Sequence, residues 1–198
     1  VTGVQTCALP ISNPMSRGQI ARWMLEEVGA DYEQVLLDYG TTMKAPAYLA
    51  INPMGKVPAL VHDGQAITEG AAIITYLAEG SDLIPTDAYE RAKMLEWMYW
   101  EQYSHEPYIA VVRFQRHMMG KSADQIEPRL MERGYGALAR MEAGLAGRAY
   151  LATDHATLAD VALVAYTRLA PQGGFDMQAY PLVQAWIARV EADLGITD

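Results

Sequence analysis

The first 80 residues alternate between short segments of helical and of strand-like periodicity. Ser16 and Gln19 have the spacing of a capping box, and apolar residues then recur every three or four positions as far as Gly29, which predicts a helix. The pattern predicts a strand over 32–37 and at most a short helix over 46–51. Helix and strand therefore follow one another closely in this part of the chain.

A β-hairpin and a further helix are expected at the end of this part. Two strand-like segments, 57–61 and 65–67, flank the dipeptide Asp63-Gly64, which favours a tight turn between paired strands. Residues 71–78 have the pattern of a helix. Elements in this order predict a small α/β layer fold.

Beyond a predicted linker at 81–86 the pattern is helical throughout. A long helix is expected to bend at Pro107, and Thr157 and Asp160 have the spacing of a second capping box. The predicted helices span 88–119, 124–145, 157–169 and the stretch that contains Val183, Trp186, Ile187 and Val190. This part is therefore predicted to be a helical bundle without strands.

Composition and charge narrow the possible functions. Hydrophobic residues make up 51% of the chain, charged residues 20%, and the net charge is -9. No basic cluster favours nucleic-acid binding, and no apolar run reaches the roughly 20 residues of a membrane span, so neither partner is expected. A single cysteine, Cys7, excludes a disulfide framework, a CxxC pair and a Cys-rich zinc site within one chain. The four histidines lack metal-ligand spacing, so we expect no metal and a reducing, cytoplasmic setting.

The first eleven residues are not expected to belong to the natural protein. Residues 1–11 resemble the conceptual translation of a common DNA-sequencing adapter, and natural sequence is expected to resume near Ser12 or Asn13. The segment lacks the basic start and long apolar middle of a signal peptide. The alternative is a natural strand, because 4–9 is moderately strand-like.

Two motifs resemble those of the glutathione transferase family. Residues 52–60, Asn-Pro-Met-Gly-Lys-Val-Pro-Ala-Leu, and residues 68–77, which begin Thr-Glu-Gly-Ala-Ala, match its motifs in sequence and in mutual spacing. Residues 13–27 are similar to the first helix of bacterial and fungal members, and Ala159-Asp160 to the start of a helix in the family's bundle core. The resemblance implies an α/β plus all-α fold, with an N-terminal thioredoxin-like domain (12–80) and a C-terminal helical-bundle domain (87–198).

The resemblance also implies a glutathione site. In the family the proline of the first motif is cis, here Pro58, and the backbone of the preceding residue, here Val57, pairs with the cysteinyl part of glutathione. Glu69 would meet the γ-glutamyl ammonium, the N–H of Gly70 its carboxylate, and Lys56 a glutathione carboxylate. Most members have Ser where this chain has Gly70, so a hydroxyl donor is missing.

Each assignment has a structural alternative. Val57-Pro58 could simply begin a buried strand. A carboxylate such as Glu69 is favoured at a helix N-terminus by the helix dipole alone. Lys56 could be a solvated surface residue.

The family's nucleophile is the thiol of glutathione, which needs a hydrogen-bond donor at the start of the first helix. Ser16 is the leading candidate, although it could act only as an N-cap. Asn13 and Ser12 are rivals in the same loop, and Arg17 could stabilise the thiolate electrostatically. No tyrosine lies in this loop, and Cys7 falls in the adapter-like segment, so a serine- or asparagine-type loop is expected.

The electrophile is expected to bind between the two halves, against the first helix of the bundle. Candidate lining residues are Tyr99, Tyr103, Tyr108, Arg113 and His117, although aromatic residues at helical spacing are more often core or dimer contacts. The implied function is detoxifying conjugation of glutathione to small hydrophobic electrophiles by a homodimer. Dehalogenase, isomerase and peroxidase variants use the same thiolate, and a non-catalytic glutathione-binding module is the main alternative.

Overall fold

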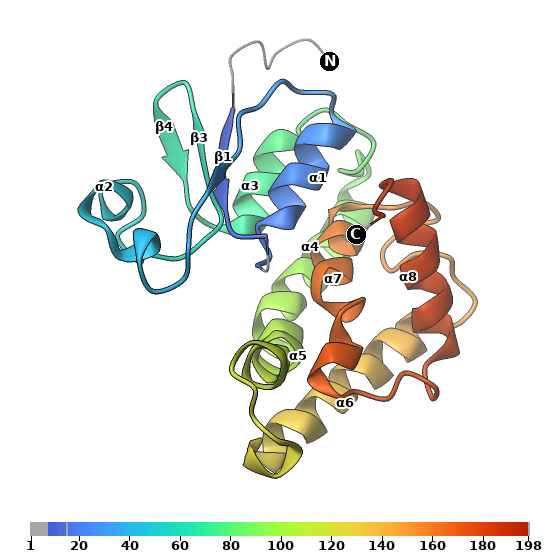
Figure 1. The fold of residues 1–198 in the computed structure, drawn as a ribbon. Helices are drawn as coiled ribbons and strands as arrows, with labels where there is room; N and C mark the ends of the chain where they lie inside the picture. Colours follow the sequence, from blue (N-terminus) through green and yellow to red (C-terminus); the bar gives the residue numbers. More distant parts are fainter. Residues whose placement is uncertain (1–7, 15, 198) are drawn as a thin grey trace. The chain divides into compact units, whose positions relative to one another are not determined.

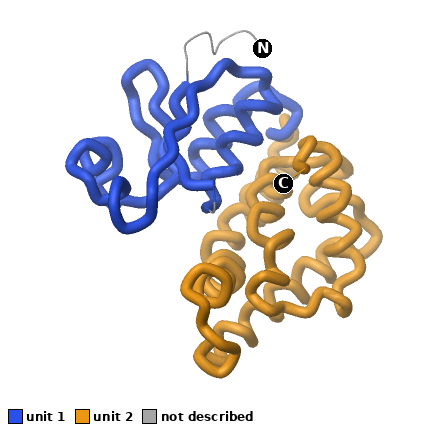
Figure 2. The backbone as a smooth tube through the Cα atoms, viewed as in Figure 1, with its two compact units in different colours: residues 1–84 blue, residues 85–198 orange. Residues whose placement is uncertain are grey.

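The computed structural model describes residues 8–14 and 16–197, which fall into two compact units divided between Ile84 and Pro85 (Figure 2). Of the adapter-like segment, residues 1–7 with Cys7 lie outside the described residues. Its last residues belong to the first strand of the sheet, β1 (Leu9–Ser12).

The first unit is built on a four-stranded mixed sheet with the order β2-β1-β3-β4. Strand β1 pairs in parallel with β2 (Val35–Leu36) and antiparallel with β3 (Ala59–His62), which pairs antiparallel with β4 (Gln65–Ile67). Helices α1 (Gln19–Glu27) and α3 (Gly70–Leu77) pack against each other beside the sheet (Figure 1). The predicted α/β layer fold is confirmed.

The elements of this unit follow the predicted order, but the observed strands are shorter than the predicted ones. Only Val35–Leu36 of the predicted strand 32–37 joins the ladder, although Tyr32 forms an isolated bridge to Ala8. The hairpin turn is confirmed, because Asp63 and Gly64 both adopt positive φ, as its tight geometry requires. A 3-10 turn, η1 (Thr42–Lys44), and the one-turn helix α2 (Pro46–Leu49) separate β2 from β3.

The capping box predicted at Ser16 is wrong. Helix α1 begins at Gln19 with Gly18 in the N-cap position, and no side chain caps it. Ser16 Oγ accepts the N–H of Gly18 at 2.9 Å, and the Gln19 side chain donates to Pro14 O at 3.1 Å. Gly18 is packed so closely on Ser12 that a Cβ there would lie 2.4 Å from Ser12 Cβ. Close packing of the helix start on β1, rather than a side-chain cap, therefore sets where α1 begins.

The second unit is a bundle of helices with no strand among its described residues. The long helix predicted over 88–119 is interrupted, and one of its two π-helical segments ends two residues before Pro107. The elements are α4 (Ala88–Trp100), η2 (Glu101–His105, π), α5 (Glu106–Arg113), η3 (Phe114–Met118, π), η4 (Ala123–Gln125, 3-10), α6 (Pro128–Gly144), α7 (Leu158–Thr167), η5 (Ala170–Gly173, 3-10) and α8 (Pro181–Asp193).

Helix α7 is the centre of the bundle, and nearly all its residues are buried. Its predicted capping box is confirmed: Asp160 accepts from the Thr157 N–H at 2.9 Å and from the Thr157 hydroxyl at 3.0 Å. The same carboxyl accepts from Leu151 N at 3.1 Å and from Trp186 Nε1 at 2.8 Å. Burial raises the pKa of the Asp160 carboxyl, and these hydrogen bonds oppose that shift.

Candidate functional site

One end of the sheet gathers the residues of both sequence motifs. Strand β1 ends, β3 begins and β4 ends at this edge. Continuing the register from Ile11 opposite Ala59 places Asn13 level with Val57. Continuing the other ladder from Leu60 opposite Ile67 places Glu69 level with Pro58. Residues from three separate stretches of sequence therefore meet beside the Val57-Pro58 bond.

The Val57-Pro58 peptide bond is cis, as expected. Pro58 is buried, whereas Val57 is half-buried. Neither main-chain group of Val57 is hydrogen-bonded to another residue within 8–14 and 16–197. An N–H and a C=O in this state can pair with an extended peptide ligand in the manner of an added strand.

The loop before Val57 is fixed by side chains whose role the sequence did not reveal. The Tyr48 hydroxyl and Asn52 Nδ2 both donate to the carbonyl of Lys56, the latter at 2.7 Å. Lys44 Nζ donates to the carbonyl of Gly55 at 3.0 Å. Burial raises the pKa of Tyr48, while its hydrogen bonding with Asn52 acts in the opposite direction. These contacts hold the loop in place and leave the Lys56 side chain exposed.

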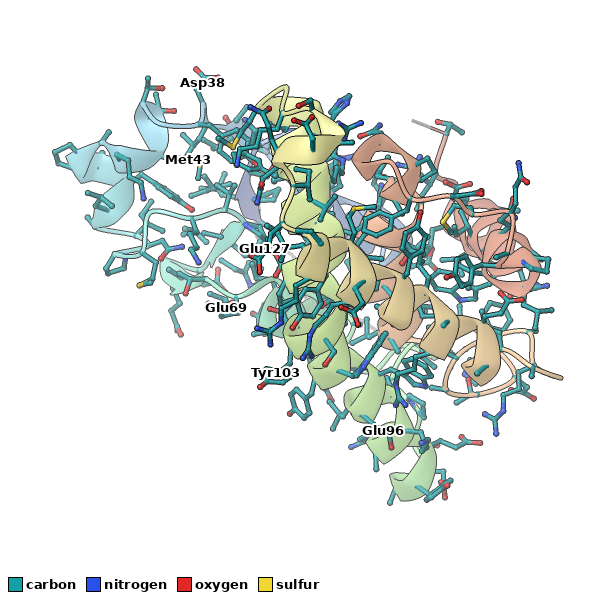
Figure 3. All side chains as sticks on the ribbon, turned by 90° about the horizontal axis from the view of Figure 1, so that it is seen from below. Asp38, Met43, Glu69, Glu96, Tyr103 and Glu127 are labelled. Carbon is teal, nitrogen blue, oxygen red and sulfur yellow. The ribbon has the colours of Figure 1, made fainter. Side chains whose placement is uncertain are left out.

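Glu69 and Gly70 form the start of α3. Glu69 is exposed and occupies the N-cap position, but its side chain makes no capping hydrogen bond (Figure 3). The carboxylate nevertheless lies at the positive end of the helix dipole, so the structural alternative for Glu69 stays open. The first turn of α3 itself contains no acidic residue.

The two leading thiol-donor candidates are bonded to the protein itself. Ser16 Oγ donates to the carbonyl of Asn13 at 2.7 Å while accepting the N–H of Gly18. The side-chain amide of Asn13 donates to Leu37 O at 2.7 Å, and Asn13 is 8% exposed. Ser16 is half-buried and lies at the surface of the loop, so of the two it is the better placed to reach a ligand.

The remaining loop candidates are buried. Ser12 is 1% exposed, and its hydroxyl accepts from Gln34 Nε2 at 3.1 Å. Arg17 is 8% exposed and lies beside the start of α3: its Nε is 3.7 Å from the position that a Cβ on Gly70 would occupy. The structure thus brings Arg17 and Gly70 together, a contact that the sequence did not predict.

The residues of the helical unit that were expected to contact the electrophile do not line a common pocket. Tyr99, Tyr103 and His117 are exposed, and Tyr103 projects outward from its helix with 83% of its surface accessible (Figure 3). Tyr108 lines a surface groove of about 570 Å³ with Trp100 and with residues of α6, and the guanidinium of Arg133 lies 5.8 Å from its ring centroid. Tyr103 and His117 do not line this groove.

Arg113 lies in the interior of the second unit. It is 5% exposed, and its Nε donates to Gln172 Oε1 at 2.7 Å. This position favours a structural role, in which the guanidinium ties α5 to the 3-10 turn η5.

Comparisons with known proteins decide the family. The models of the glutathione S-transferase N-terminal and C-terminal domains match residues 12–79 and 106–193. Glutathione S-transferase 3 of Zea mays is 35% identical over 185 residues, which cover 85% of this chain and 82% of the relative. The chain belongs to the glutathione S-transferase family. The expected family and fold are thereby confirmed.

Other members of the family extend the comparison. The crystal structure of a glutathione S-transferase from Pseudomonas fluorescens superposes with a TM-score of 0.90 at 39% identity, and the match covers 94% of this chain and 96% of that one. The disulfide-bond oxidoreductase YfcG of Escherichia coli is 27% identical over 90% of this chain and 87% of its own. The printed names of these relatives therefore state different reactions.

Within 8–14 and 16–197, no group of three or more His, Cys, Asp or Glu residues could hold a metal ion. Over the same residues, none of the helices is both long enough and apolar enough to cross a membrane.

Proposed function

We propose that this glutathione S-transferase binds glutathione, activates its thiol and adds it to small hydrophobic electrophiles. The observation that supports this most directly is the open main chain of Val57, next to a cis proline and level with Asn13 and Glu69. The family and the printed names of its relatives support the same ligand.

Each part of glutathione has a partner in the proposed site. The backbone of Val57 pairs with the cysteinyl part, and the exposed Glu69 carboxylate meets the γ-glutamyl ammonium. The N–H of Gly70, at the start of α3, receives the γ-glutamyl carboxylate, since helix N-termini bind anions. Lys56 meets the other carboxylate.

In this proposal Ser16 stabilises the thiolate. Its hydroxyl now donates to Asn13 O and has to rotate toward the sulfur. A neutral hydrogen bond is worth about 0.5–1.5 kcal/mol and one to an anion about 1.5–3 kcal/mol, so the exchange is favourable. The N-terminus of α1 adds about 0.3–1 kcal/mol. Together these terms lower the pKa of the thiol by about one to two units.

The electrophile is proposed to contact the helical unit through Tyr103, Tyr108 and His117. Arg113 was a further candidate for contacting the electrophile and lies on the same helical segment. Its guanidinium is hydrogen-bonded to Gln172, so it is the weakest candidate of the four. We propose that the enzyme acts in detoxification in the cytoplasm.

A non-catalytic glutathione-binding module is the second candidate. It is favoured by Gly70, which lacks the hydroxyl found in most members, and by the hydrogen bond that commits the Ser16 proton to Asn13. The first feature would weaken binding of the γ-glutamyl carboxylate and the second activation of the thiol, and neither closes the site at Val57.

Retention on immobilised glutathione, followed by a chromogenic conjugation assay with a chloronitrobenzene, tests the two candidates. Retention with turnover supports the enzyme, and retention without turnover supports the module. If the folded protein passes through the column unretained and is inactive, both candidates are wrong.

A further inference from the structure

Arg17 reaches the place where a side chain at position 70 would begin. A Cβ on Gly70 would lie 3.7 Å from Arg17 Nε, 3.6 Å from Pro58 Cγ and 3.2 Å from Ile20 Cδ1. The guanidinium therefore borders the position where a side chain at residue 70 would begin. Arg17 itself is held there, because only 8% of its surface is accessible.

The Glu69 carboxylate occupies the N-cap of α3, next to Gly70, and the first turns of α1 and α3 add no further acidic residue. The two helices pack against each other. Arginine stays charged at every pH at which proteins fold, and a helix N-terminus adds a partial positive charge. The combination is suited to a carboxylate.

We propose that Arg17 binds the γ-glutamyl carboxylate of glutathione and takes the place of the hydroxyl that is missing at Gly70. This inference rests on the proposed glutathione-binding function. A guanidinium offers parallel N–H donors that match the two oxygens of a carboxylate, so it replaces a single hydroxyl donor with a stronger, charge-assisted contact. It differs from a role for Arg17 in stabilising the thiolate, because the carboxylate belongs to the γ-glutamyl residue and the thiol to the central cysteine.

Calorimetric binding of S-methylglutathione separates these roles, because that ligand keeps the γ-glutamyl carboxylate and cannot form a thiolate. We expect Arg17→Met to raise its Kd roughly tenfold or more, and Arg17→Lys to raise it less, since lysine keeps the charge but loses the paired donors. Arg22→Met is the matched control on the same helix: Arg22 pairs with Glu26 at 3.1 Å, and the Kd should stay within twofold.

A second ligand identifies the atoms involved. The analogue N-(4-aminobutanoyl)-S-methylcysteinylglycine lacks only the γ-glutamyl carboxylate, so Arg17→Met should not weaken its binding further. Thermal unfolding of each variant shows whether the protein remains folded, and Arg17→Lys keeps the test valid if Arg17→Met does not fold.

A hydroxyl restored at position 70 provides an independent check. In the Arg17→Met background, Gly70→Ser should recover part of the lost affinity and Gly70→Ala should not. Both add the same Cβ against Ile20, so the difference between them isolates the hydroxyl.

The outcomes distinguish this inference from the function on which it depends. If wild type does not bind S-methylglutathione, the proposed function fails. If wild type binds it and Arg17→Met binds it equally well, the function stands and the carboxylate assignment is overturned. An Arg17→Met variant that leaves this Kd unchanged but raises the pKa of bound glutathione would assign Arg17 to the thiolate.

Discussion

At the residue scale, the Ser16 hydroxyl has two competing acceptors, the carbonyl of Asn13 and the proposed thiolate. The first is a neutral hydrogen bond of 2.7 Å within a loop. The second would be charge-assisted and therefore stronger. Ligand binding is thus expected to rotate one hydroxyl rather than to move the backbone.

Removing that hydroxyl should affect turnover more than binding. We expect Ser16→Ala to lower kcat/KM about tenfold near neutral pH, because the pKa of the bound thiol rises by about one unit while the contribution of the α1 N-terminus remains. The Kd for S-methylglutathione should change little. Thiolate absorbance followed against pH measures the shift directly.

Asn13→Ala serves as the comparison for this experiment. The Asn13 amide is bonded to Leu37 O, so its loss should reduce stability without shifting the thiol pKa. If Asn13→Ala abolishes turnover and Ser16→Ala leaves it intact, the thiol donor has been assigned to the wrong residue.

Individual site residues differed in how far the sequence could predict them. Val57-Pro58 and Glu69 belong to contiguous motifs, and the structure places them together at one end of the sheet. The support that Tyr48 gives to Lys56 depends on a tertiary contact that no local pattern encodes. Likewise, the burial of Arg113 follows from its partner Gln172, 59 residues further along the chain.

At the element scale, two of the three glycines of α6, Gly134 and Gly136, have opposite surroundings. A Cβ on Gly134 would lie 2.4 Å from Phe175 Cζ, so this position allows the ring to pack against the helix. A Cβ on Gly136 would meet nothing within 4 Å. One glycine is therefore required by packing, whereas the other only weakens the helix.

These two glycines form a matched pair for mutation. Gly134→Ala should lower the free energy of unfolding by about 1–3 kcal/mol through overpacking against Phe175. Gly136→Ala should raise it by about 0.5–1 kcal/mol, because alanine is the better helix former. Urea denaturation measures both, and equal effects of the two changes would contradict the packing argument.

The end of α8 is tied to the chain before α7 by a hydrogen bond that responds to pH. The Tyr150 hydroxyl donates to Asp193 Oδ2 at 2.5 Å. Burial, followed by this bond to a carboxylate, raises the pKa of Tyr150 to about 12. A folded-state pKa above the ordinary value of 10 stabilises the fold fully below pH 10, and this contribution is lost as the pH rises through about 12.

Tyr150→Phe tests this contribution. We expect wild type to be more stable than the variant at pH 8, and the difference to shrink as the pH rises from 9 toward 12. Chemical denaturation at successive pH values measures it. A difference that stays constant over this range would show that the phenol titrates equally in the folded and unfolded states.

The boundaries of the helices were harder to predict than their existence. The capping box of α7 is local in sequence and is confirmed, whereas the start of α1 depends on how closely Gly18 approaches Ser12. The π-helical segment η2 lies next to Pro107, where a bend was predicted, whereas η3 left no trace in the apolar periodicity of 88–119.

At the scale of the whole molecule, the exposed aromatic side chains along the first helices of the second unit favour self-association. Tyr99 and Tyr103 are 70% and 83% exposed and lie one helical turn apart. Clusters of exposed aromatic residues are typical of protein–protein contact surfaces.

We therefore expect a homodimer in solution. Each copy carries a net charge of -9, so copies repel one another at low salt. Sedimentation should therefore be measured at about 0.15 M salt, where this repulsion is screened. Sedimentation velocity at micromolar concentration should show a single species of twice the chain mass. A monomer under these conditions would contradict the expectation and would assign the exposed tyrosines to another role.

The interior position of β1 in the sheet has a consequence for synthesis on the ribosome. This strand emerges early, but its neighbours β2 and β3 follow much later, and 50 residues separate Ser12 from His62. At about 5–20 residues per second, roughly 3–10 s pass before the second neighbour has been made. During that interval the strand in the place of β1, here with the buried residues Ala8 and Ile11 of the adapter-like segment, has no sheet to cover it. The nascent chain therefore passes through a period in which its first strand is a target for chaperones and for misassociation.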